Sequence, residues 1–100
     1  MNVTIKQEGN KYDVTLEGRL DTTNADQFQK DITPLMQSGK SEIILDCTEM
    51  EYTSSQGLRM FLMLQKYVNQ QGGTMEMRNM RPQVKEVFDI TGFSSIIKIA

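Results

Sequence analysis

The chain has 100 residues, of which 38% are hydrophobic and 24% are charged, and its formal net charge is −2. This composition is typical of one globular domain, which we expect to span residues 1–100. The sequence contains no histidine and a single cysteine. These counts exclude Ser-His-Asp and Cys-His catalysis, an internal disulfide and the usual zinc sites. We therefore expect a protein that is not an enzyme and that binds no metal and no small-molecule cofactor.

Charge and hydropathy patterns also limit the partners. No basic run or basic-aromatic stripe is present, which argues against nucleic-acid binding. The longest apolar run, residues 60–64, is far too short to span a membrane, so we expect no membrane insertion. The N-terminus shows no signal-peptide pattern. We therefore expect a cytoplasmic protein.

The first half of the chain predicts a hairpin followed by a helix. Apolar and polar residues alternate over residues 3–7 and again over residues 12–17, which is typical of two strands with one buried face. The run Asp-Thr-Thr-Asn at residues 21–24 is rich in capping residues. Apolar side chains then recur at helical spacing and predict a helix from about Asn24 that Pro34 ends or kinks.

The second half predicts alternating strands and helices. The apolar run at residues 43–45 is interpreted as a short strand covered on both faces, and residues 57–68 as a helix. A strand at residues 74–78 and a helix starting near Pro82 follow, and residues 96–99 end the chain as a short strand or an extended tail. The order β-β-α-β-α-β-α predicts an α/β domain in which helices pack on a small mixed sheet.

Two loops are candidates for a functional site, because partner sites in α/β sheets gather at the C-terminal ends of strands. They span residues 18–24 and residues 46–57. Ser54 and Ser55 begin the long helix, where free backbone N–H groups favour either a side-chain cap or a phosphate. Asp21 in the first loop is equally consistent with a helix cap and with a partner contact.

Three further features have two interpretations each. Cys47 follows an apolar strand and is interpreted as a core residue rather than a reactive thiol. The carboxylates of residues 46, 49 and 51 could suggest a metal site, but we interpret them as a solvated acidic rim. Leu62 and Met63 project away from the apolar face of the long helix, beside Arg59. They either pack under neighbouring loops or contact a partner, and Met63 is the better contact candidate.

Four segments in order along the chain resemble one known family. They are Leu-Glu-Gly-Arg-Leu-Asp at 16–21, Ile-Ile-Leu-Asp-Cys at 43–47 with Tyr-Thr-Ser-Ser-Gln-Gly-Leu at 52–58, Gly-Gly at 72–73, and Arg-Pro-Gln-Val-Lys-Glu-Val-Phe-Asp-Ile-Thr-Gly-Phe at 81–93. The set resembles the STAS domain of bacterial anti-sigma factor antagonists over nearly the whole chain. The resemblance implies a single STAS-type domain.

The resemblance also implies a partner switch that regulates transcription. The unphosphorylated antagonist would bind an anti-sigma factor that is also a serine kinase, and so release a sigma factor. The kinase would use ATP to phosphorylate a serine at the start of the second helix, which breaks the complex, and a serine phosphatase would reverse the modification.

The family motif at this serine is Asp-Ser-Ser-Gly-Leu, with the first serine phosphorylated. A gapless alignment on Gly57 and Leu58 makes Ser55 the phosphoacceptor, with Ser54 at the acidic position and Gln56 in place of the second serine. Aligning the two serines directly would make Ser54 the acceptor. We prefer Ser55, because an inserted residue would rotate the following apolar stripe by about 100°.

The predicted partner surface combines the two loops with the exposed face of the long helix. It comprises Asp21, Thr22, Thr53, Ser54, Ser55, Gln56, Arg59 and Met63. We expect a phosphate on Ser55, among the acidic neighbours Asp21, Asp46, Glu49 and Glu51, to act by charge and bulk at the interface rather than by refolding. The alternatives are a stand-alone STAS subunit of a transport ATPase, for example in lipid trafficking, and an unswitched protein-interaction module.

Overall fold

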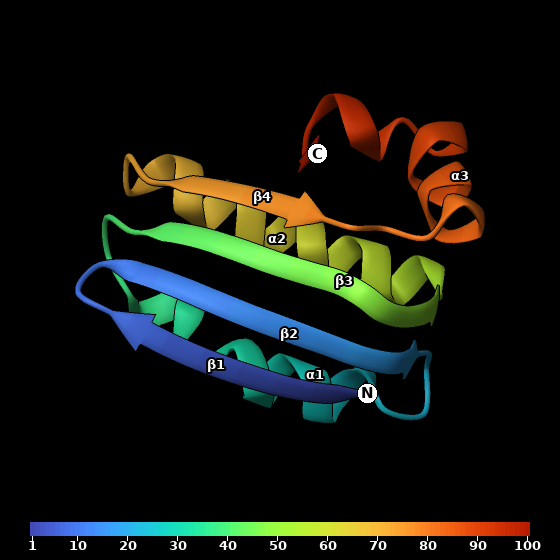
Figure 1. Ribbon diagram of the computed structural model, residues 1–100, viewed down its shortest axis with the longest axis horizontal. Helices are drawn as coiled ribbons and strands as arrows, with labels where there is room; N and C mark the ends of the chain where they lie inside the picture. Colours follow the sequence, from blue (N-terminus) through green and yellow to red (C-terminus); the bar gives the residue numbers. More distant parts are fainter.

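Five strands form one sheet in the order β1-β2-β3-β4-β5 in the computed structural model, which describes residues 1–100 (Figure 1). The strands are β1 (Asn2–Glu8), β2 (Lys11–Leu20), β3 (Glu42–Thr53), β4 (Thr74–Arg78) and β5 (Lys98–Ile99). β1 pairs antiparallel with β2, and all other neighbours are parallel. The predicted hairpin and mixed sheet are confirmed.

Each parallel connection carries a helix. The helices are α1 (Ala25–Ile32), α2 (Ser55–Gln70) and α3 (Pro82–Ile90), with short 3-10 turns η1 (Leu35–Gln37) and η2 (Phe93–Ser95). The predicted α/β class and the order β-β-α-β-α-β-α are confirmed, and the C-terminal apolar run is a two-residue strand. None of the helices is long and apolar enough to cross a membrane.

The core lies between the sheet and the helices. In Figure 1 the strands β1–β4 lie in front of α1 and α2. Phe28 of α1 meets Phe61 of α2 edge to face with 5.4 Å between ring centroids, and Phe61 lies 6.1 Å from Phe88 of α3. These three buried rings join the helices to one another.

The two faces of β3 have different surroundings. Ile43, Ile44 and Leu45 are all buried, as predicted. Because successive side chains point to opposite faces, Ile43 and Leu45 face the helices and Ile44 faces the open side of the sheet. There Ile44 lies in register between Asp13 of β2 and Glu76 of β4. Strand neighbours rather than a second helical layer therefore flank it.

β3 is much longer than the sequence predicts, because it continues to Thr53 and the expected loop from residue 46 is strand. Its register with β2 shifts twice, and each shift inserts one extra residue into β3. The buried residues Cys47, Met50 and Thr53 are therefore three apart and do not alternate. Cys47 is a core residue as predicted, and burial raises the pKa of its thiol to about 12.

Candidate functional site

Of the two predicted loops only the ends remain outside the strands, and these ends lie side by side, because β2 and β3 are parallel neighbours that end together. Arg19 pairs with Tyr52 and Leu20 with Thr53 in the register. The backbone N–H of Ser54 donates to the carbonyl of Leu20 at 2.8 Å. The loop that contains Asp21 and the start of α2 are thereby fixed to each other, as expected for loops at neighbouring strand ends.

Ser54 and Ser55 occupy different positions at the start of α2. Ser54 is the N-cap, and its half-buried side-chain oxygen accepts the backbone N–H of Gly57 at 3.2 Å. Ser55 is the first helical residue and is exposed, and its hydroxyl takes part in no hydrogen bond within the protein. The backbone N–H groups of Ser55 and Gln56 have no intrahelical acceptor. Ser54 is therefore the helix cap, and Ser55 carries the free hydroxyl.

Thr53 is a correction to the predicted partner surface. Its side chain is 3% exposed, and its hydroxyl donates to the carbonyl of Ser54 at 3.2 Å. A Cβ added to Gly57 would clash with this hydroxyl oxygen and would lie 2.7 Å from Leu20 Cδ2. Thr53 was expected at the surface because the sequence does not reveal the extra residues of β3. Instead it forms part of the surface against which α2 begins.

Asp21 organises its own loop. Its carboxylate accepts the backbone N–H of Thr23 at 3.0 Å and the Thr23 hydroxyl at 2.5 Å. These bonds, the side-chain one first, lower the pKa of Asp21. Asn24 precedes α1 without a side-chain cap bond, and its side chain instead accepts from the Asp21 N–H and donates to the Arg19 carbonyl. Asp21 therefore does not cap α1, and Thr22 lies exposed at the tip of the loop.

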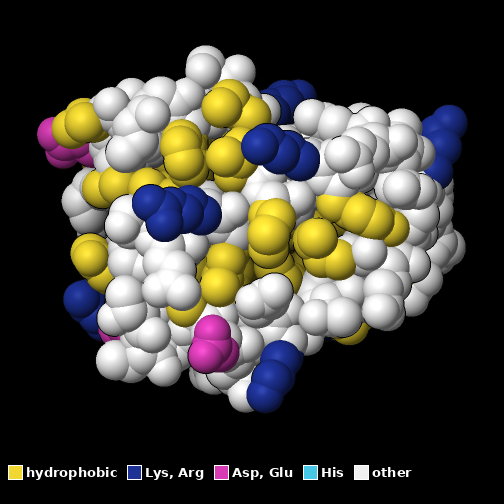
Figure 2. Space-filling model, turned by 180° about the vertical axis from the view of Figure 1, so that it is seen from behind, with side chains coloured by type: hydrophobic (Ala, Val, Ile, Leu, Met, Phe, Trp, Pro, Cys, Tyr) yellow, Lys and Arg dark blue, Asp and Glu magenta, His cyan; other side chains and the backbone are white.

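One exposed stripe runs along α2 from the free serine. Ser55, Arg59 and Met63 are exposed and follow one another at intervals of four residues, so they share one side of the helix. Met63 is 41% exposed, whereas Leu62 is half-buried. Figure 2 views the helical face and shows apolar side chains gathered across its middle with Lys and Arg side chains among them. Such a mixed apolar and basic surface is suited to protein contact.

Two site residues were missed by the sequence reasoning. The Arg19 guanidinium lies over the ring of Tyr52, 4.5 Å from its centroid, which is a cation–π contact between neighbouring strand ends. Tyr52 is 39% exposed. The only available signal was the position of both residues at strand ends, because their pairing depends on the shifted register of β3.

The predicted acidic neighbours of Ser55 are dispersed. Asp46 lies in the middle of β3, where its carboxylate accepts from Thr48 and Asn79. Strand residues 47–53 and then Ser54 separate it from Ser55, so its predicted proximity is wrong. Glu49 pairs with Arg81 at 3.3 Å. No group of three or more Cys, Asp and Glu side chains is placed to hold a metal ion.

Comparison with known proteins places the fold and the family. Two solved structures of the Bacillus anti-sigma factor antagonist SpoIIAA superimpose on 99% of the chain. The unphosphorylated form gives a TM-score of 0.80 at 20% sequence identity, and the chain covers 88% of that protein. The phosphorylated form gives a TM-score of 0.74 at 19% sequence identity, and the chain covers 91% of it.

Sequence similarity is closer to a curated relative. The anti-sigma-B factor antagonist of Bacillus subtilis is 31% identical over 100 residues, which are 100% of this chain and 91% of that protein. A family model described as the STAS domain matches residues 2–100. The chain therefore belongs to the STAS domain family.

Proposed function

We propose that the protein is a bacterial, cytoplasmic anti-sigma factor antagonist, a binding protein that captures an anti-sigma factor and so releases a sigma factor. The observation that carries the proposal is the exposed, unbonded hydroxyl of Ser55 at the first position of α2, next to a serine already used as the cap. The full-length similarity to a curated anti-sigma-B factor antagonist supports the same role.

The proposed partner surface surrounds Ser55. It combines the loop at Asp21 and Thr22 with Ser54, Gln56 and the α2 stripe that continues to Arg59 and Met63. Met63 supplies an adaptable apolar contact and Arg59 a cation that can pair with a partner carboxylate. Arg19 and Tyr52 border this surface at the ends of β2 and β3.

Phosphorylation of Ser55 would switch the surface off. The Ser55 oxygen attacks the γ-phosphorus of ATP in the kinase site of the anti-sigma factor. The bond to the bridging oxygen breaks, ADP leaves, and the hydroxyl proton passes to a base of the kinase. A serine phosphatase restores the hydroxyl by adding water across the phosphoester bond and releasing inorganic phosphate.

The phosphate would act at the interface. It adds about −1.5 to −2 charge, and a partner surface that fits a neutral serine would have to bury this charge without a matching cation. The penalty for such an unpaired buried charge is several kcal/mol. Since every 1.4 kcal/mol, roughly, changes an equilibrium constant tenfold, this is sufficient to dissociate a micromolar complex.

A matched serine pair tests the proposal. The full chain and its Ser54→Ala and Ser55→Ala variants are incubated with ATP and a candidate anti-sigma kinase from the same organism, and the modified residue is mapped by mass spectrometry. We expect one phosphate on the native chain and on Ser54→Ala, and none on Ser55→Ala.

Binding measured by calorimetry completes the test. Ser55→Ala should bind the anti-sigma factor as the native chain does, and Ser55→Asp should bind at least tenfold more weakly. Modification of Ser54 would contradict the assignment of Ser55. Binding of Ser55→Asp with unchanged affinity would contradict the switch, and no modification by any such kinase would favour the transport-subunit or unswitched role.

A further inference from the structure

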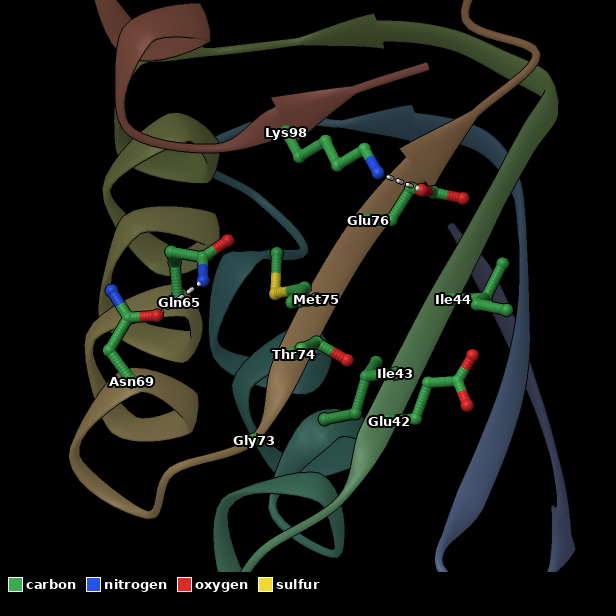
Figure 3. A pocket seen from close by; sticks show the side chains of 10 residues that line it. All are labelled: Glu42, Ile43, Ile44, Gln65, Asn69, Gly73, Thr74, Met75, Glu76 and Lys98. Carbon is green, nitrogen blue, oxygen red and sulfur yellow. Dashed lines mark hydrogen bonds and ion pairs between the residues drawn. The ribbon is translucent and has the colours of Figure 1, made fainter.

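A groove lies at the end of the sheet opposite Ser55. It occupies about 370 Å³ between the second half of α2 and the start of β4, and its lining includes Glu42, Gln65, Asn69, Thr74, Met75 and Lys98 (Figure 3). Glu42 and Thr74 are the first residues of β3 and β4, whereas Ser55 lies two residues beyond the last residue of β3. The groove is therefore separate from the proposed partner surface.

The groove exposes an unpaired strand edge. β5 pairs only with Glu76 and Met77, so the first residues of β4 have no strand neighbour on the side away from β3. The carbonyl of Met77 accepts the N–H of Ala100 across this edge. Because backbone groups two residues apart point to the same edge of a strand, Met75 also faces this edge. The pairing of Glu76 with Lys98 engages the Met75 carbonyl and leaves the Met75 N–H without a strand partner. An unpaired edge of this kind is a template for an added strand.

A buried acceptor without a partner lines the same groove. Gln65 is 6% exposed, and its Nε2 donates to Asn69 Oδ1 at 2.9 Å, but its Oε1 has no hydrogen-bond partner. In Figure 3 the Gln65 oxygen points away from Asn69 on the helix side of β4. A buried amide oxygen without a donor is costly. A ligand that supplies a donor on the helix side would satisfy this oxygen.

The opposite rim of the groove carries an unpaired negative charge. Glu76 is paired with both Arg78 and Lys98, the latter at 3.1 Å. Glu42 is exposed, makes no ion pair and lies in register beside Thr74 on the open face of the sheet. A side chain that reaches across Thr74 would meet this carboxylate, and a lysine or arginine is its complement.

We propose that this groove binds an extended segment of a partner protein that extends the sheet at β4. Side chains of such a segment alternate between the two faces. Those on the helix side carry hydroxyl or amide donors for Gln65 Oε1, and those on the open side are basic and reach Glu42. The recognised class is thus an alternating basic and polar β-strand.

Blocked synthetic pentapeptides test this proposal by NMR on the full, isotope-labelled chain. The probe is Lys-Thr-Lys-Thr-Lys, and its matched controls are Lys-Val-Lys-Val-Lys, which lacks the donors, and Glu-Thr-Glu-Thr-Glu, which reverses the charge. We expect saturable shifts at the Thr74 and Met75 amides and the Gln65 side chain. The valine peptide should bind about fivefold more weakly, the equivalent of about 1 kcal/mol, and the acidic peptide should give no saturable shift.

A substitution cycle links the effect to Gln65. In Gln65→Leu, which must retain a native-like spectrum, the threonine and valine peptides should bind equally. In Glu42→Gln, at an exposed site, the lysine peptide should lose affinity. Equal binding of both peptides to the native chain would overturn the proposal, as would shifts that avoid β4. Concentration-dependent shifts of Met75 without peptide would show instead that a second copy occupies the edge.

Discussion

Ser54 and Ser55 are adjacent in the sequence but differ in the contacts of their hydroxyls. We expect Ser54→Ala to lower the free energy of unfolding by about 1 kcal/mol, because it removes the acceptor of the Gly57 N–H. Ser55→Ala should change it by less than about 0.5 kcal/mol, because its hydroxyl is exposed and unbonded. Urea denaturation of both variants measures the difference. A larger loss for Ser55→Ala would show that the roles of cap and free hydroxyl are reversed.

A negative charge at residue 55 should be tolerated by the free protein. The helix N-terminus attracts anions, and Arg59 lies one turn further along the same side. We expect Ser55→Asp to raise the free energy of unfolding by about 0.3–1 kcal/mol at low ionic strength, and less in high salt. Thermal unfolding with and without salt measures this, and Ser55→Asn is the uncharged control. A lower stability of the aspartate variant would indicate that the switch acts by unfolding α2.

At the scale of elements, periodicity predicted the helices better than it predicted β3. The apolar spacing of α2 and the Pro82 start of α3 were sufficient to find both helices. β3 was underestimated because its two extra residues change the spacing of its buried side chains from two to three. The same irregularity hid the burial of Thr53.

The candidate site was predictable to a similar extent. The parallel order of β2 and β3 was sufficient to place the Asp21 loop beside Ser55. The contact of Arg19 with Tyr52 depends on the shifted register, which no local pattern indicates. Gln65 is a polar residue in a helix, and such a residue is expected to be exposed. Its burial could not be predicted, because it depends on how α2 packs beside β4.

Gly57 tests how closely α2 packs against the strand ends. Helix propensity alone predicts a gain of about 0.8–1 kcal/mol for Gly57→Ala. The structure predicts the opposite, a loss of about 1–3 kcal/mol, because the added Cβ would overlap Thr53 and Leu20 in a filled space. Gln56→Ala, one residue earlier in the same turn, is the control and should be nearly neutral. An increase in stability for Gly57→Ala would mean that the start of α2 is free to move.

At the scale of the molecule, the switch surface and the β4 groove lie at opposite ends of one sheet. The proposed phosphorylation adds charge at one end, and two continuous regular elements, α2 and β3, connect that end with the groove. The chain superimposes on both the unphosphorylated and the phosphorylated SpoIIAA structures, so SpoIIAA keeps this fold in both of its forms. We therefore expect peptide binding at β4 to be the same before and after modification of Ser55, as titration of the phosphorylated protein would check.

Acid should destabilise the whole domain through three carboxylates. The pKa of each is lowered, mainly by a hydrogen bond from a neighbouring side chain. The donor is Thr23 for Asp21, Thr48 for Asp46 and Arg78 for Glu76. Each group releases its proton more readily when folded, so its stabilising effect is present above about pH 4 and is lost as pH falls through the lowered pKa. Unfolding free energy measured by urea titration should thus be level near neutrality and fall below about pH 4. Thr48→Val should make this fall in unfolding free energy less steep, because it removes the hydroxyl that donates to Asp46. Thr4 is an exposed threonine on the same sheet, and Thr4→Val should leave the fall unchanged. An identical slope in both variants would contradict the role of Thr48.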